Sequence, residues 1–297
     1  MKKNGKVELE KLKMRPRVYK GILMPDNEVE VIENMNTRED DIWVCSYPRS
    51  GTTLTQQIVS LVMTLDFKAA TTVQLDERFP QVDITDERYP YFKGVKYIEQ
   101  LPSPRMVKCH LHHFLLPEQL RNGKGRIIYI ARNPKDVVVS WYHLLEWTDE
   151  LLDDLDTWDK FLDSFVDGTG IFCPWPRHVT EYWERRDDKN VLFLKYENVT
   201  KDISKAVKDI ACFLNREITD EDVDRISKFC HVDNMRKNDM ANLSYWRDFK
   251  KVNDNAGGRF INKGKSGVWK EFLSHEEATR NDGLLEQVKQ SGLTFED

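Results

Sequence analysis

Short apolar segments bounded by polar or turn-forming residues recur along the chain at the length of buried strands. The first, Ile42-Trp-Val-Cys-Ser-Tyr47, lies between Asp40-Asp41 and Pro48, which is typical of a strand covered on both faces. Three more segments of this kind predict strands at 106–109, 126–131 and 191–195.

Apolar residues recur at helical spacing between and after these segments. Helices are predicted over 52–63, 134–145, 203–214, 219–230 and 275–290. Pro134 suits a first helical turn, and Thr219-x-x-Asp222 approximates a capping box with Asp in place of Glu. Strands that alternate with helices predict an α/β fold with a central parallel sheet flanked by helices.

The chain shows no repeat or linker that would divide it, so residues 1–297 are interpreted as a single domain. Residues 1–38 are charged and weakly patterned, and we expect an N-terminal arm or surface layer there. Residues 240–270 are polar and contain glycine, with little periodicity. A segment of that length without regular structure is often a functional loop.

Charge and composition argue against nucleic acid and membranes as binding partners of this protein. The 297 residues include 45 Lys+Arg against 50 Asp+Glu, a net charge of −5, which argues against a general nucleic-acid or anionic-membrane binder. The longest apolar stretches are too short to span a membrane, and the N-terminus has no apolar signal segment. Five cysteines without CxxC spacing favour buried thiols in a reducing compartment, so we expect a cytoplasmic protein without membrane or nucleic-acid partners.

Candidate chemistry begins at Tyr47-Pro-Arg-Ser-Gly-Thr-Thr-Leu54, between a predicted strand and a predicted helix. Backbone N–H groups at such a helix start can hold an anion. Gly51 permits close approach of the backbone, Thr52 and Thr53 add hydroxyls, and Arg49 adds charge. An ordinary strand–turn–helix is the alternative. The segment is not a Walker A motif, which argues against an ATPase or kinase.

A second candidate is Lys108-Cys-His110, at the end of the predicted strand 106–109. An imidazole with an ordinary pKa near ~6.5 can accept a hydroxyl proton at neutral pH. The Lys108 ammonium could stabilise charge on a transferring group. A metal site that uses His110 and His112 is an alternative, because the two share one face of a strand, but no third ligand stands at a suitable spacing.

Five segments, in order, resemble motifs of the cytosolic sulfotransferases. The first is the loop 47–54. The second is Lys108-Cys-His110-Leu ahead of Leu115-Leu-Pro117. The remaining three are Tyr129-Ile-Ala-Arg132-Asn-Pro-Lys-Asp136-Val-Val-Val-Ser140, Leu194-Lys-Tyr196-Glu-Asn, and Arg259-Phe-Ile-Asn262-Lys263-Gly264-Lys-Ser-Gly267-Val-Trp269-Lys270.

The resemblance implies a P-loop-like sulfotransferase fold and transfer of a sulfuryl group from 3′-phosphoadenosine 5′-phosphosulfate (PAPS) to a hydroxyl or amine of a small molecule, without a metal. It implies that His110 is the general base and that Arg49 and Lys108 stabilise charge. The residues implied to bind PAPS lie in the first loop, at the 3′-phosphate, at the adenine and in the closing loop: Arg49, Ser50, Gly51, Thr52, Thr53, Leu54, Arg132, Ser140, Tyr196, Asn262, Lys263 and Gly264.

Several positions depart from the family pattern. Arg49 stands in place of the catalytic Lys, Leu54 in place of an adenine-stacking Trp, and Asn262 in place of an Arg. Two further adenine-contacting positions read Cys230 and Val232. We expect weaker adenine contacts unless Trp43 or another aromatic side chain compensates.

The sequence leaves the oligomeric state, the catalytic activity and the type of acceptor open. The dimer motif reads Lys270-x-x-x-Ser-His-x-x-x-Thr279, so we expect a monomer or weak homodimer. A catalytically weak PAPS-binding protein and, as a more distant alternative, a nucleotide kinase or NTPase remain open. Aromatic residues suggest an apolar or aromatic acceptor, although core packing would explain them equally well: Phe79, Tyr89, Tyr91, Phe92 and Tyr245.

Overall fold

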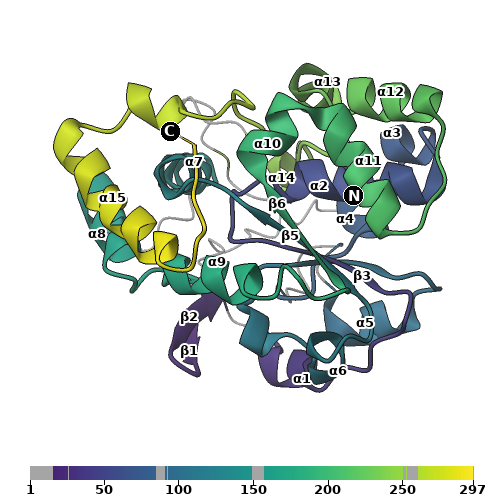
Figure 1. Ribbon diagram of the computed structural model, residues 1–297, viewed down its shortest axis with the longest axis horizontal. Helices are drawn as coiled ribbons and strands as arrows, with labels where there is room; N and C mark the ends of the chain where they lie inside the picture. The colour runs from purple at the N-terminus through teal and green to yellow at the C-terminus, as the bar shows by residue number, and fades with distance from the viewer. Residues whose placement is uncertain are drawn as a thin grey trace, which may run out of the picture.

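Four parallel strands form the centre of the molecule (Figure 1). The computed structural model describes residues 16–25, 27–84, 91, 93–148, 157–249, 252 and 260–296, without the side chains of 248 and 249. The strands are β3 (Ile42–Cys45), β4 (Met106–Cys109), β5 (Arg126–Ala131) and β6 (Val191–Lys195), in the order β4-β3-β5-β6. All four predicted strands and the parallel sheet are therefore confirmed, although β3 ends at Cys45 rather than Tyr47.

The predicted long helices are also present. They are α2 (Thr52–Thr64), α7 (Pro134–Trp147), α11 (Ile203–Phe213), α12 (Asp220–Phe229) and α15 (His275–Lys289). The capping box at Thr219 and Asp222 is formed in both directions, which satisfies backbone N–H groups at the start of α12.

Shorter elements complete the fold. They are α1 (Val29–Glu33), α3 (Ala69–Thr72), α4 (Leu75–Arg78), α5 (Gly94–Gln100), η1 (His113–Leu115), α6 (Glu118–Arg121), α8 (Trp158–Val166), α9 (Trp175–Trp183), α10 (Tyr196–Lys201), α13 (Val232–Lys237), α14 (Trp246–Phe249) and η4 (Val268–Glu271).

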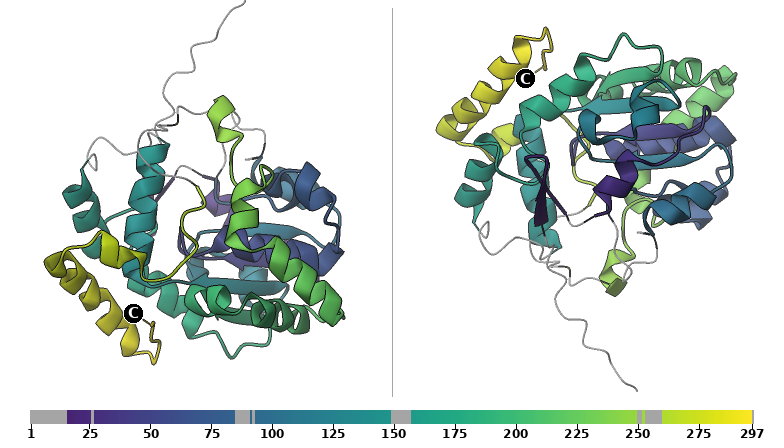
Figure 2. Two further views of the ribbon diagram at one scale, coloured as in Figure 1. Left: turned by 90° about the horizontal axis from the view of Figure 1, so that it is seen from above. Right: turned by 90° about the horizontal axis from the view of Figure 1, so that it is seen from below.

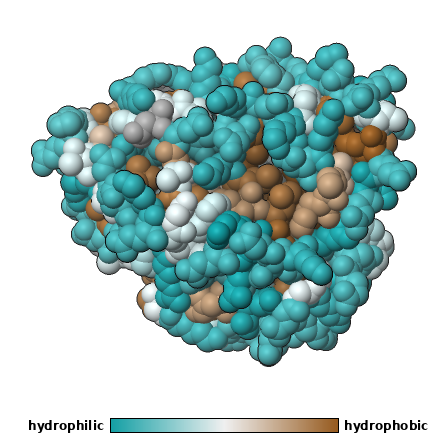
Figure 3. All heavy atoms as spheres, in the orientation of Figure 1, coloured by the Kyte–Doolittle hydropathy of each residue, from teal (hydrophilic) through white to brown (hydrophobic). Residues whose placement is uncertain are grey.

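Side chains alternate along β3 between two hydrophobic cores. Trp43 and Cys45 pack in one core, whereas Ile42 and Val44 pack in the other with α2, α11 and α12. Figure 2 shows α8 and α15 on one side of the molecule and α11 and α12 on the opposite side. The surface in Figure 3 is mainly hydrophilic, with apolar atoms near its middle, where Figure 1 places the edge strand β6.

The segment predicted as an arm or surface layer contains regular structure in its described part. Strands β1 (Pro16–Tyr19) and β2 (Ile22–Pro25) form an antiparallel hairpin ahead of α1. Ile22, Met24 and Ile32 are fully buried in the first core. Four of the five cysteines are buried, but Cys212 is exposed, so the expectation of buried thiols was wrong at that position.

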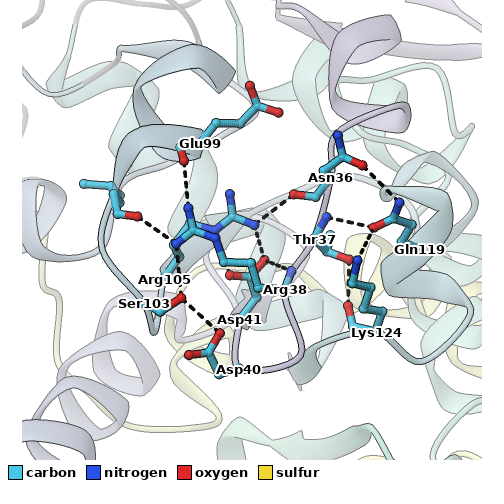
Figure 4. A network of polar contacts seen from close by, with 11 residues as sticks. Asn36, Thr37, Arg38, Asp40, Asp41, Glu99, Ser103, Arg105, Gln119 and Lys124 are labelled. Atoms are coloured by element: carbon cyan, nitrogen blue, oxygen red, sulfur yellow. Dashed lines mark hydrogen bonds and ion pairs between the residues drawn. The ribbon is translucent and has the colours of Figure 1, made fainter.

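The amino-terminal ends of β3 and β4 are joined by a polar network (Figure 4). Arg105, only 2% exposed, donates from Nε to Asp41 Oδ1 over 2.7 Å and forms a second contact with Asp41 Oδ2. Arg38 donates to the carbonyl oxygens of Leu101 and Glu99. The described part of the chain contains no helix long and apolar enough to cross a membrane.

Candidate active site

The predicted anion loop connects the carboxyl end of β3 to α2. Gly51 has a φ of +106°, and a Cβ at this position would lie 2.5 Å from Cδ2 of Tyr196, so a larger residue would displace the tyrosine ring. Ser46 Oγ and Thr52 Oγ1 share a hydrogen bond of 2.6 Å. The buried Ser50 Oγ has no hydrogen-bond partner. A buried hydroxyl left unpaired is costly, so Ser50 points to a ligand at this loop.

His110 lies beside this loop at the end of β4. Its Nδ1 is 2.9 Å from the carbonyl oxygen of Ser46. Because a carbonyl can only accept, Nδ1 carries the proton and Nε2 carries the lone pair. Nε2 makes no hydrogen bond to a residue that the structure describes. The imidazole is thus oriented with its basic nitrogen available.

The electrostatic setting of His110 differs from the expectation of an ordinary imidazole. Burial, the Lys108 ammonium and the Arg49 guanidinium lower the pKa of His110 to about 3. Burial also lowers the pKa of Lys108. His110 is therefore neutral at physiological pH and can accept a proton without first losing one, although it is a weaker base than predicted.

Asp83 contacts His110 and was missed in the sequence. Its Oδ2 accepts the backbone N–H of His110 at 3.0 Å, and its buried Oδ1 has no partner. Burial raises the pKa of Asp83 to about 6. Residues 80–82 pair with Lys108 through two backbone hydrogen bonds, which place Asp83 beside the site. No motif indicates this role, because the contact is made to the backbone of a residue 27 positions away.

Two guanidinium groups meet on the other side of the loop. Arg49 donates from Nε to Ser140 Oγ (3.1 Å) and from Nη2 to the carbonyl oxygen of Phe260 (2.7 Å). Arg132 donates to the Arg49 carbonyl oxygen and lies 4.4 Å from the centre of the Tyr196 ring, while its buried Nε has no partner. Burial and Arg132 lower the pKa of Arg49 to about 10. Adjacent cations of this kind favour an anionic ligand.

The predicted closing loop is attached to α7 and α13 in its described part. Asp136 accepts the backbone N–H groups of Gly267 (2.8 Å) and Trp269 (3.1 Å). Arg236 holds the carbonyl oxygen of Asn262 at 3.0 Å through Nε. A Cβ at Gly264 would lie 2.4 Å from Val232, so the glycine permits the loop to pack there. These contacts place residues 262–269 next to Arg132.

Within the described part of the chain, the other predicted site residues make no hydrogen bond or ion pair with Arg49, His110 or Arg132. Lys263 forms an ion pair with Glu271. Thr53 and Leu54 are half-buried in the first turn of α2. Trp43 is fully buried in the first hydrophobic core, so the suggestion that it could compensate as an adenine-stacking residue was wrong.

The metal alternative finds no support in the geometry of the histidines. His112 Nε2 contacts the carbonyl oxygen of Phe172 at 3.0 Å, and its ring packs against His178. Among the residues described, no group of three or more His, Cys, Asp or Glu side chains could hold a metal ion.

Comparison with known proteins decides the family. Residues 39–291 match the family model of the sulfotransferase domain. The chain belongs to the sulfotransferase family. It is 32% identical to an amine sulfotransferase of Oryctolagus cuniculus, over 90% of this chain and 87% of that protein. It is 33% identical to sulfotransferase 1A1 of Rattus norvegicus, over 84% and 85% of the two chains.

Solved structures agree with this assignment. A retinol dehydratase in complex with androsterone and the inactive cofactor PAP has a TM-score of 0.83 at 28% identity, covering 93% of this chain and 89% of that one. Mouse sulfotransferase SULT7A1 with PAP has a TM-score of 0.72 at 26% identity, covering 93% and 95%. This sulfotransferase is therefore a PAPS-dependent transferase of the predicted fold that acts on small acceptors.

Proposed function

We propose that this sulfotransferase moves the sulfuryl group of PAPS to a hydroxyl, or an amine, of a small apolar or aromatic acceptor, with His110 as the base. The products are a sulfate ester, or the sulfated amine, and adenosine 3′,5′-bisphosphate. The observation that carries the proposal is the neutral His110, with Nδ1 held by Ser46 and Nε2 unpartnered among described residues, beside Lys108 and the loop of Arg49.

The residues around the loop fit a ligand with two separate anionic groups. The unpaired Ser50 hydroxyl and the backbone of the loop at Gly51 suit the 5′-phosphosulfate, together with Thr52 and Thr53. The unpaired Arg132 Nε and Ser140 suit the 3′-phosphate. Tyr196 and Leu54 would flank the adenine. Residues 262–264 would close over the ligand, with Lys263 released from Glu271.

PAPS, when bound, supplies the activated sulfuryl group. His110 Nε2 takes the proton of the acceptor hydroxyl as its oxygen attacks sulfur. Arg49 and Lys108 stabilise the negative charge that develops on the transferring and leaving oxygens. Asp83 holds the backbone of His110, so that the base stays aligned with the acceptor.

Replacement of the proposed base tests the function directly. The variant His110→Ala is expected to lose about 10²–10⁴-fold in transfer of labelled sulfate from PAPS to a panel of phenols, sterols and amines. Binding of adenosine 3′,5′-bisphosphate, measured by calorimetry, is expected to persist. His275→Ala is the matched control, because His275 is exposed at the start of α15. Full turnover by the His110 variant would reject the assigned base.

An aromatic acceptor is supported by a third hydrophobic cluster, formed by Trp147, Leu243, Tyr245 and Trp246. Phe260 packs against this cluster, and its ring lies 5.1 Å from the Arg49 guanidinium. Androsterone and retinol, bound by retinol dehydratase, and the amine sulfotransferase relative are consistent with small acceptors of both kinds.

The altered segment 270–279 supports a monomer or weak homodimer. The net charge of −5 and the five cysteines without CxxC spacing support a cytoplasmic protein without nucleic-acid or membrane partners. Light scattering that finds a stable dimer at nanomolar concentration would contradict this assembly.

A further inference from the structure

Side chains from distant parts of the chain hold the backbone of His110. The pairing of β3 with β4 ends at Cys45 and Cys109, one residue before the proposed base. The N–H of His110 donates to Asp83, and its carbonyl oxygen accepts a hydrogen bond of 3.0 Å from Nε2 of His178. His178 lies on α9 and is fully buried. The position of the base therefore depends on a residue 68 positions away, outside the motifs identified in the sequence.

The protonation state of His178 follows from its two partners. A carbonyl oxygen can only accept, so Nε2 of His178 carries the proton. Its Nδ1 lies 2.9 Å from the hydroxyl oxygen of Tyr129 on β5 and accepts that O–H. Burial, and then the nearby imidazole of His112, place the pKa of His178 well below its ordinary value, so the ring is neutral and keeps this tautomer. His178 is thus a fixed donor to the carbonyl oxygen of His110.

A second side chain of α9 holds the residue that follows the base. Tyr182 donates from its hydroxyl to the carbonyl oxygen of Leu111 over 2.7 Å. His178 and Tyr182 are four positions apart on α9, so they project from the same face of the helix. Their rings pack against the ring of Tyr129, at centroid distances of 5.8 Å and 4.0 Å. Side chains of α9 and β5 together form a packed support for the two residues that follow β4.

The ring of His110 depends on this support of its backbone. Nδ1 of His110 reaches the carbonyl oxygen of Ser46 over 2.9 Å, and this bond leaves Nε2 as the nitrogen that takes a proton. A catalytic group displaced by about 1 Å can lose about 100-fold in rate. A donor that fixes the His110 backbone therefore affects the transfer reaction through the position of the imidazole.

We propose that His178 is a positioning residue for sulfuryl transfer, because its hydrogen bond to the His110 carbonyl fixes the backbone from which the catalytic imidazole reaches the acceptor. This inference rests on the proposed function, in which His110 is the base. His178 acts through His110, and its own proton stays on Nε2 throughout the reaction. Tyr129 keeps His178 in the required tautomer, and Tyr182 supports the same segment from α9.

The test compares His178→Phe, which keeps an aromatic ring and removes the donor, with His178→Gln, whose amide N–H can replace Nε2–H. For the acceptor that the parent sulfates fastest, His178→Phe is expected to lower kcat about 10- to 100-fold and to change KM by less than about 3-fold. His178→Gln is expected to recover most of the rate. His113→Phe is the matched control, because it makes the same replacement at another buried histidine, whose ring packs against Tyr182.

The same substitution in the His110→Ala background separates positioning from a merely structural role. Since the base is absent there, His178→Phe is expected to change the residual rate by less than about 2-fold. An equal loss of rate in both backgrounds overturns the inference, because His178 would then act independently of His110. Full kcat in His178→Phe alone overturns it as well.

Nitrogen NMR of the histidine rings in the enzyme without ligand gives a readout that does not depend on turnover. The parent should carry protons on Nδ1 of His110 and on Nε2 of His178, and His110→Ala identifies the first signal. His178→Phe is expected to speed solvent exchange of the His110 Nδ1 proton about 10-fold or more. Unchanged exchange overturns the inference, even if the variant is a slow enzyme. Full turnover by His110→Ala, with faster exchange in His178→Phe, would reject the proposed base and leave the support of His110 by His178 standing.

Discussion

The two ends of the parallel sheet differ in how far their buried cations are paired with groups of the protein. At the amino-terminal end, Arg105 is paired with Asp41, and Arg38 is bonded to backbone carbonyls (Figure 4). At the carboxyl end, Arg49, Lys108 and Arg132 gather, with unpaired atoms at Arg132 Nε and Ser50 Oγ. The first group is satisfied within the protein. The second is paired only in part, through Asp136, Ser140 and the carbonyl oxygen of Phe260, and its unpaired atoms remain available to a ligand.

The difference follows from the geometry of a parallel sheet. Loops at the carboxyl ends of the strands converge and present backbone N–H groups and helix starts to a shared space. The opposite ends are closed by short connections, so buried charges there must find partners in the protein. The same residue type therefore stabilises the fold at one end and is proposed to serve binding at the other.

The largest expected effect is on stability at the amino-terminal end. Arg105→Met leaves the buried Asp41 carboxylate without its partner and is expected to lower the free energy of unfolding by about 3–5 kcal/mol. Urea denaturation measures the change. The double variant Arg105→Met, Asp41→Leu should recover much of the loss, since it removes both charges. If Arg105→Met kept its stability and instead bound adenosine 3′,5′-bisphosphate more weakly, the proposed division between a structural and a binding end of the sheet would be wrong.

The next effect is on binding at the carboxyl end. Arg132→Gln is expected to weaken adenosine 3′,5′-bisphosphate about 10- to 100-fold, as for removal of one charged hydrogen-bond donor. Its free energy of unfolding should change by less than about 1 kcal/mol. Asp136, which lies 3.7 Å from Arg132, keeps its hydrogen bonds from the backbone of Gly267 and Trp269, and removal of the Arg132 guanidinium relieves its repulsion of Arg49. Calorimetry and urea denaturation give the two values, with the exposed Arg225→Gln as control. Unfolding of the variant with unchanged ligand affinity would contradict the comparison.

The smallest expected effect is on the pH dependence of stability. The unfolded chain protonates His110 below about pH 6.5, but the folded protein does so only near about 3, so His110 makes stability fall as the pH drops below 6.5. Between pH 7 and pH 5.5, His110→Gln should therefore lose about 1 kcal/mol less than the parent. Urea denaturation at the two pH values measures this, with His275→Gln as control. Identical losses in parent and variant would show that His110 is not held neutral.

Much of the fold was predictable because it depends on local patterns. The four strands and five long helices follow from apolar spacing and turn residues that act within about a dozen positions. Arg49, Ser50, His110 and Arg132 were predicted as site residues because they lie in contiguous motifs. Asp83 and His178 were not, since each contacts His110 from a distant part of the sequence. Trp43 shows the converse, because its position in a strand did not reveal that its side chain packs in the first hydrophobic core and not against the ligand.

The sequence by itself determined the sheet, the phosphate-type loop and the residue types available for sulfuryl transfer, because hydrophobic periodicity and contiguous motifs are local properties. Only the tertiary structure decided which charges are neutralised. It paired Arg105 with Asp41, left Ser50 Oγ and Arg132 Nε unpaired, and shifted the pKa of His110 far below that of a free imidazole. The reason is that burial and electrostatic interaction depend on distances between segments that the chain brings together only by folding.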